Sequence, residues 1–306
     1  MPAIPVCLNH CASYETKLLR TSLQEQLDLL EVPSDLSFKR VLFKPNLLSG
    51  RAPALACSSP LFTVAVADCF LSRGATVLLG DSPAFGSAAQ VLKQQGFVPH
   101  FSGRDITPVS FQTRVVKKLA CGISVGVAAE ALDCDYFVNL PRIKAHGQMG
   151  VTMAVKNVFG IVLGARKAWL HMRHGGSCET FARMILDLQE LLPPAFVLAD
   201  GIEVMSDKGP MHGNSLMLGC LAASRSSVAL DRAMIEVLEV DRDEVPLVRA
   251  AQEKKIQGSR LRDIVFPQYS PSTFAGSGFS LPAIRIPIRF GSFRYLKSSL
   301  KRMVSR

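Results

Sequence analysis

The sequence lacks the motifs that mark the commonest metal and nucleotide sites. Its eight cysteines include no CxxC pair, and zinc ribbons and iron–sulfur clusters need closely spaced thiolates. Neither GxxxxGK[ST] nor GxGxxG occurs, which disfavours ATP or NAD binding through those loops. We expect most cysteines to be buried, reduced thiols, with metal binding through cysteine as the alternative.

Long apolar segments are also missing. No run approaches the roughly 18–20 apolar residues that cross a bilayer, and the N-terminal segment has no basic region followed by an apolar one. We therefore expect no transmembrane segment, no signal peptide and a cytoplasmic location.

Acidic residues are absent after Asp263. That segment contains seven basic residues, and removing them reduces the formal net charge of the chain from +10 to +3. The remaining sequence has no basic stripe with interleaved aromatics, so we expect no nucleic-acid partner. We predict an α/β domain over residues 1–265, then a linker and basic C-terminal tail over 266–306. Residues 293–304 are predicted as an amphipathic helix that docks on the domain, with an acidic surface or a membrane face as alternatives.

Short apolar runs alternate with helical patterns along the rest of the chain. The runs at 41–43, 75–80, 136–140 and 196–199 suit strands that are covered on both faces. Apolar stripes at helical spacing predict helices over 60–73, 86–95, 178–191 and 227–239. This alternation predicts an α/β fold with a mostly parallel sheet flanked by helices, in Rossmann-like layers.

Polar residues follow each predicted strand. They are Lys44 and Asn46, Asp81, Lys144 and His146, and Asp200. Ligands of open α/β sheets bind at the carboxyl ends of the strands, so we expect these side chains to meet in one site. For Asp81, in Gly80-Asp81-Ser82-Pro83, the alternatives are an anion site and a capped helix. For Asp200 they are a divalent metal such as Mg²⁺ and an ordinary loop.

Residues 144–171 contain lysines, histidines and glycines in an otherwise apolar stretch. A charge in such a stretch must reach water or a counter-charge. If residues 152–159 are helical, Thr152 and Lys156 share one face. His146 is the expected general acid or base, with metal binding as the alternative.

Taken together, these motifs resemble the DUF362 family, a domain of unknown function. The similarity covers roughly residues 4–265, in the family's order, and the matching motifs are KPN at 44–46, GDSP at 80–83, T-x-A-x-KN-x-FG at 152–160 and VALD at 228–231. The resemblance implies an iron–sulfur description, since many members have a ferredoxin-like extension. No cysteine follows Cys220 here, so we expect no such cluster in this chain.

Two functional hypotheses remain open. The first is an enzyme that acts on a small anionic substrate, in which positive groups stabilise developing negative charge. Its catalytic residues would be His146, Lys156 and Lys144, its substrate-binding residues Lys44, Asn46, Asn157, Lys167 and His171, and its metal ligands Asp81 and Asp200. The second is a redox or assembly partner that docks on a ferredoxin-like protein through the basic tail.

Overall fold

The computed structural model of the chain describes residues 2–163, 170 and 178–283. Ten described strands form one sheet: eight lie in the order β12-β1-β11-β10-β7-β2-β3-β4, β8 pairs with β10, and β9 pairs with β8. The strands are β1 (Ile4–His10), β2 (Arg40–Pro45), β3 (Thr76–Asp81), β4 (Ile106–Ser110), β7 (Tyr136–Leu140), β8 (Arg142–His146), β9 (Gly150–Thr152), β10 (Ala195–Ser206), β11 (Asn214–Ser224) and β12 (Ile264–Val265).

Parallel pairing dominates the centre of this sheet. β2 pairs in parallel with β3 and β7, β3 with β4, and β7 with β10. The antiparallel exceptions are β11, between β1 and β10, and the β8–β9 hairpin. The predicted α/β class with a mostly parallel sheet is therefore confirmed.

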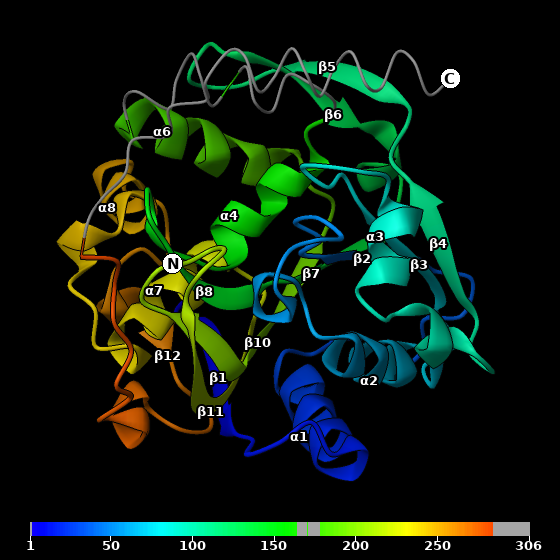
Figure 1. Cartoon of the computed structure of the whole chain (residues 1–306), viewed down its shortest axis with the longest axis horizontal. Helices are drawn as coiled ribbons and strands as arrows, with labels where there is room; N and C mark the ends of the chain where they lie inside the picture. The colour runs from blue at the N-terminus through cyan, green and yellow to red at the C-terminus, as the bar shows by residue number, and fades with distance from the viewer. Residues whose placement is uncertain (1, 164–169, 171–177, 284–306) are drawn as a thin grey trace.

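Helices cover both faces of the sheet. Helices α1 (Thr16–Leu29), α2 (Pro60–Leu71) and α3 (Ala88–Gln94) pack on one face, and α4 (Ala154–Val158), α6 (Cys178–Leu188), α7 (Ser227–Val237) and α8 (Pro246–Glu253) pack on the other. Figure 1 shows α1 and α2 on the opposite side of the sheet from α4 and α6. The four helices predicted from the apolar stripes are thus confirmed as α2, α3, α6 and α7.

Local signals set the beginnings of these helices. Ser59 accepts a hydrogen bond from the N–H of Phe62 at the start of α2, where Pro60 occupies the first turn. Ser87 and Gln90 form a reciprocal capping box at the start of α3.

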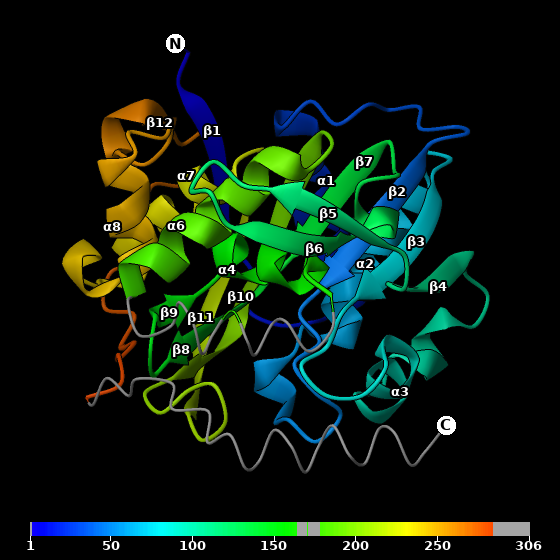
Figure 2. The ribbon, with the colours of Figure 1, turned by 90° about the horizontal axis from the view of Figure 1, so that it is seen from above.

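On the other face, the hairpin of β5 (Arg114–Lys118) and β6 (Ser124–Ala128) lies across the side that bears α4 and α6 (Figure 2).

The strand that begins as β7 is interrupted and then continues. Pro141 separates β7 from β8, and both pieces pair with β10 in parallel. β2 pairs with β7 as far as Pro45 and Leu140, and it ends there. β8 therefore extends beyond the carboxyl end of β2 and leaves a step at this rim of the sheet.

Two predictions of local structure are wrong. Asp200 does not end a strand, because β10 continues to Ser206 through a register shift at Gly201. A side chain at Gly201 would overlap the carbonyl oxygen of Cys220, so this glycine permits a close backbone approach rather than a strand exit. Thr152 lies in strand β9 and not on the helix of Lys156, since α4 begins at Ala154.

Residues 266–283 pack against the sheet domain. The ring of Phe274 is buried with α7, and the N–H of Tyr269 donates to the carbonyl oxygen of Leu8. The predicted helix at 293–304 and the rest of the basic tail lie outside the described residues. Within the part of the chain that the structure describes, no helix is both long and apolar enough to cross a membrane.

Two phenylalanines near β2 provide a matched test of this packing. Phe43 is 0% exposed and lies in the core with α2, whereas Phe38 is 96% exposed. We expect Phe43→Ala to lower the free energy of unfolding by about 3–5 kcal/mol and Phe38→Ala to change it by less than about 0.5 kcal/mol. Urea unfolding measures both values, and equal losses would contradict the described position of β2.

Candidate functional site

The strand order reverses between β2 and β7. From β2 the chain proceeds outward to β3 and β4, and it then returns to β7 on the other side of β2. At such a switch point the connections leave in opposite directions, and a crevice opens at the carboxyl ends of the two strands. Lys44 and Asn46 lie at the end of β2, and Lys144 lies on β8, the continuation of β7. The topology therefore places three of the predicted residues at this switch point, where Lys44 and Lys144 are buried.

A buried ion pair connects the ends of β2 and β3. Lys44 Nζ lies 2.9 Å from Asp81 Oδ1, and both side chains are buried. The Asp81 carboxylate also accepts hydrogen bonds from the N–H groups of Leu47 and Ser82, each at 2.8 Å. Burial lowers the pKa of the Lys44 amine, and the carboxylate of Asp81 opposes this change. Asp81 is thus a counter-ion for Lys44, and the helix that follows this segment is capped by Ser87, as one of the two alternatives predicted; an anion site here stays a prediction.

Helix α4 contacts the same ion pair. Lys44 Nζ donates to Asn157 Oδ1 at 3.1 Å, and Asn157 Nδ2 donates to the carbonyl oxygen of Lys44 at 3.2 Å and to Asn139 Oδ1 at 2.7 Å. A Cβ atom at Gly160 would overlap both Asp81 Oδ1 and Lys44 Nζ. Asn157 and Gly160 of the 152–160 motif thus lie against one buried ion pair.

Strand β8 presents a row of basic side chains to the loop that precedes α2. Arg142, Lys144 and His146 alternate with Ile143 and Ala145, so the three basic residues share one face. Ile143 packs into the core of the α7 side. The basic row therefore faces the α2 side, where Arg142 Nη1 donates to the carbonyl oxygen of Cys57 at 3.4 Å.

Lys144 is buried without a counter-charge. Its Nζ donates to Asn46 Oδ1 at 3.2 Å and to the carbonyl oxygen of Ala56. No ion pair of Lys144 occurs among the residues that the structure describes. Burial lowers the pKa of its amine to about 8; Arg142 and Lys44 lower it further, and Cys57 and Asp81 oppose the change. Lys144 therefore differs from Lys44, which faces Asp81.

His146 lies at the half-buried end of the row. Its Nδ1 accepts hydrogen bonds from the N–H groups of Gln148 and Met149, each at 3.2 Å. A nitrogen that accepts has no proton, so the ring proton is on Nε2. The turn of the β8–β9 hairpin thus fixes both the orientation and the tautomer of the imidazole.

Asp200 belongs to a second buried charge cluster. Its Oδ1 accepts from the Tyr14 hydroxyl at 2.8 Å, and its Oδ2 lies 3.8 Å from Arg142 Nε without a hydrogen bond. Arg142 also binds the carboxylate of Glu203 at 3.3 Å and its carbonyl oxygen at 2.9 Å. Burial raises the pKa of Asp200, and Arg142 opposes this change. This cluster balances Arg142, the first member of the basic row.

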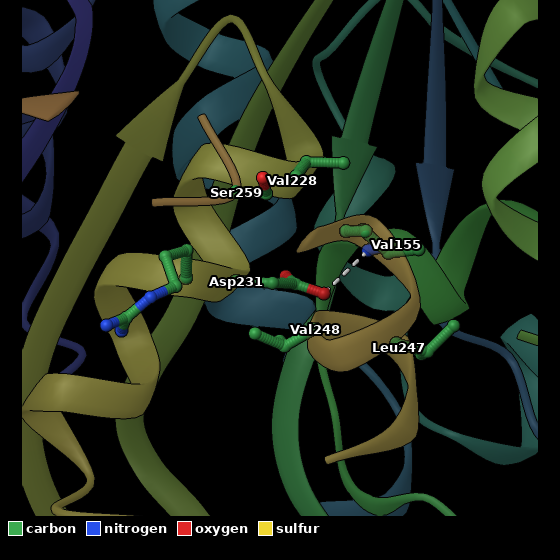
Figure 3. Close-up of a pocket in the computed structure, with 8 residues that line it drawn as sticks. Val155, Val228, Asp231, Leu247, Val248 and Ser259 are labelled. Carbon is green, nitrogen blue, oxygen red and sulfur yellow. Dashed lines mark hydrogen bonds between the residues drawn. The ribbon is translucent and has the colours of Figure 1, made fainter. Parts of the chain in front are cut away.

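Asp231 holds the beginning of α4. Its carboxylate accepts hydrogen bonds from the N–H groups of Ala154 at 2.8 Å and Val155 at 3.1 Å, and it points at that turn in Figure 3. A cavity of about 10 Å³ beside it, lined in part by Ser259, is near the lower limit for one water molecule. Burial raises the pKa of Asp231 to about 7. Asp231 therefore supports α4 and, through it, Asn157.

Three predicted site residues are not placed in the crevice. The Lys156 ammonium lies over the rings of Phe159 at 4.6 Å and Phe181 at 5.5 Å. Lys167 and His171 lie outside the described residues. The structure thus brings together Lys44, Asn46, Asn157, Asp81 and Lys144, with His146 along the strand from Lys144.

The predicted metal ligands do not converge. Asp81 faces Lys44, and Asp200 faces Tyr14 and Arg142. In the described ranges, no group of three or more histidine, cysteine, aspartate or glutamate side chains is arranged to hold a metal ion. A divalent metal at these residues stays a prediction.

Some residues of the candidate site were not predicted from the sequence. The alternation in Arg142-Ile143-Lys144-Ala145-His146 is a strand signal that would have revealed the basic row. Asn139, a polar residue inside an apolar strand, was a signal for a buried hydrogen-bond partner. Tyr14 gives no such signal, because its contact with Asp200 joins distant segments.

Comparison with known proteins places these observations in a family. Residues 41–236 match the model described as Domain of unknown function (DUF362), which confirms the resemblance. A thylakoid-associated protein of Synechocystis sp. is 36% identical over 304 residues, which cover 97% of this chain and 93% of that protein.

Two solved structures resemble the fold. The lactate racemase apoprotein from Thermoanaerobacterium thermosaccharolyticum has a TM-score of 0.51 and 12% identity, covering 78% of this chain and 57% of that one. A protein from Thermotoga maritima has a TM-score of 0.45 and 13% identity, covering 71% and 57%. The chain thus spans little more than half of each, and the first likeness shows a shared fold only.

Gly160 and Gly147 provide a matched test of the buried ion pair. Neither has a positive φ, but a Cβ at Gly160 meets Lys44 and Asp81, whereas a Cβ at Gly147 has no atom closer than 3.9 Å. We expect Gly160→Ala to lower the free energy of unfolding by about 1–3 kcal/mol through overpacking, and Gly147→Ala to change it by less than about 1 kcal/mol. Chemical denaturation checks both, and a neutral Gly160→Ala would show that the pair is loosely held.

Asp231 predicts a pH dependence of stability. Unfolded aspartate titrates near about 3.9, whereas the folded carboxyl retains its proton up to about pH 7. The folded state therefore binds more protons between these values, so this group's contribution to stability falls as the pH rises from about 4 to about 7 and is constant above.

The variant Asp231→Asn lacks this titration. The free energy of unfolding of wild type minus that of Asp231→Asn should fall across the same interval, by at most about 1.4 kcal/mol per pH unit. Urea unfolding over a pH series measures it, with exposed Asp105→Asn as the control. The same pH trend in both variants would rule out the effect.

Proposed function

This chain belongs to the DUF362 family, whose description assigns no function, and we propose from its own side chains that it is an enzyme acting on a small anionic molecule in the crevice between β2 and β8. Lys144 is the cationic contact for the ligand. His146 moves a proton, and Lys44 with Asp81 and Asn157 holds the strand ends in place.

The observation that supports this proposal most directly is the buried amine of Lys144. Its partners are two neutral oxygens, those of Asn46 and Ala56, and no carboxylate pairs with it among the described residues. A buried ammonium is costly unless it is paired. A carboxylate or phosphate of a ligand would supply the missing negative charge.

The position of His146 supports proton transfer beside that anion. It is two residues from Lys144 on the same face of β8, and its Nδ1 is engaged by backbone N–H groups. An imidazole takes up a proton to become the imidazolium and can then donate a proton from Nε2, whereas the neutral ring only donates a hydrogen bond from that atom. A ligand bound at Lys144 would lie beside His146 Nε2, because the two residues share one face of β8.

Binding of simple anions tests the proposal. Inorganic phosphate and acetate should each bind the wild-type protein in calorimetric titrations, and Lys144→Met should weaken binding about ten- to a hundredfold, because a charged hydrogen bond contributes about 1.5–3 kcal/mol. Lys39→Met is the matched control, since Lys39 is an exposed lysine paired with Asp135. Equal affinity in wild type and Lys144→Met would refute the proposed contact.

A second experiment tests the role of His146 in proton transfer. Mass spectrometry of the native protein identifies a copurifying small molecule, which then becomes the substrate of a turnover assay. We expect His146→Gln to retain affinity for it within about threefold and to lose about 10²–10⁴ in turnover. Unchanged turnover in His146→Gln would remove His146 from the chemistry without affecting the anion site.

A further inference from the structure

The amine of Lys144 is surrounded by features that favour a nucleophile over a permanent cation. It is 3% exposed, and its hydrogen-bond partners, Asn46 Oδ1 and Ala56 O, are uncharged. Arg142 lies on the same face of β8, and Lys44 lies across the crevice at the end of β2. Burial is the largest influence against the protonated amine, Arg142 and Lys44 add to it, and Cys57 and Asp81 oppose it.

The same features distinguish Lys144 from Lys44. The Lys44 ammonium has the carboxylate of Asp81 at 2.9 Å, which opposes the lowering of its pKa by burial. Lysines become nucleophiles when they are desolvated or lie beside another cation, and Lys144 meets both conditions. Burial lowers its pKa to about 8, so a far larger fraction of Lys144 than of an exposed lysine is a free amine near neutral pH.

His146 supplies the proton transfers that such a nucleophile needs. It follows Lys144 by two residues on the same strand face, and the N–H groups of Gln148 and Met149 fix its ring. Dehydration of an amine adduct requires a proton for the departing oxygen. The imidazolium form of His146 is a suitable donor, and the ring returns to its neutral form when the proton has left.

We propose that the substrate is an aldehyde or ketone that also has an anionic group, and that Lys144 binds it covalently as an imine. This rests on the proposed function, because the anionic group brings the substrate to the crevice. The Nζ lone pair forms a bond to the carbonyl carbon, and the carbonyl π electrons move to oxygen. Oxygen receives both amine protons and leaves as water, and a C=N double bond replaces the C=O bond. A proton taken up by the imine nitrogen retains the positive charge at this position.

Reductive trapping tests the imine on the intact wild-type protein. Glyoxylate, which has an aldehyde and a carboxylate, is added at pH 7 with cyanoborohydride, which converts an imine into a stable secondary amine. Peptide mapping by mass spectrometry then compares carboxymethyl labelling of Lys144 with that of exposed Lys39. We expect Lys144 to react at least about tenfold faster, since its share of free amine at this pH exceeds that of an ordinary lysine by about two orders of magnitude.

The labelling pattern decides the outcome. Labelling of Lys144 that is no faster than that of Lys39 overturns the imine, whatever the fate of any variant. Lys144→Arg keeps the charge and lacks the nucleophile, and its binding of inorganic phosphate is measured in parallel. Phosphate binding without trapping at Lys144 defeats the imine and leaves the proposed function intact, whereas absence of both in the wild-type protein defeats the two together.

Discussion

The buried ion pair of Lys44 and Asp81 is the interaction on which the crevice depends. It connects the ends of β2 and β3, and through Asn157 and Gly160 it fixes α4 against the same point. Removing one partner of a buried pair leaves an uncompensated charge, which costs about 3–5 kcal/mol in general. Asp81 also binds the N–H of Leu47 and so sets where the chain departs from β2. The strand ends near Lys144 are therefore held in place by this pair.

Much of the fold was predictable because local patterns decide it. Apolar runs identified β2, β3 and β7, and apolar stripes with caps identified α2 and α7. Asp200 and Thr152 were misplaced for a different reason. An Asp-Gly pair after an apolar run is typical of a strand exit, but here Gly201 lies close to the backbone of Cys220 on the next strand. That neighbour is distant in sequence, and only the pairing of β10 with β11 reveals it.

The sequence indicated which residue types form the candidate site, but it did not indicate which side chains pair with one another. Lysines in apolar segments had to meet a negative charge or water, and the sequence could not assign either. Lys44 meets Asp81 and Lys156 meets two aromatic rings, whereas Lys144 meets neutral oxygens. Asp81 and Asp200, which resembled metal ligands as isolated acids, compensate basic side chains from other strands. Charge balance is a property of three-dimensional neighbours, so it follows from topology rather than spacing.

Topology and chemistry contribute separately to the functional inference. A reversal of strand order like that between β2 and β7 creates a crevice in open α/β sheets generally. The TM-score of 0.51 at 12% identity with the lactate racemase apoprotein shows that such a fold is retained when most residues differ. What is particular to this chain is that β8 extends beyond β2 and places Arg142, Lys144 and His146 on one face of the strand, the first two buried and the third half-buried. Arg142 is neutralised by Asp200 and Glu203. Lys144, two residues from His146 on the same strand face, has no such carboxylate partner in the described part of the chain.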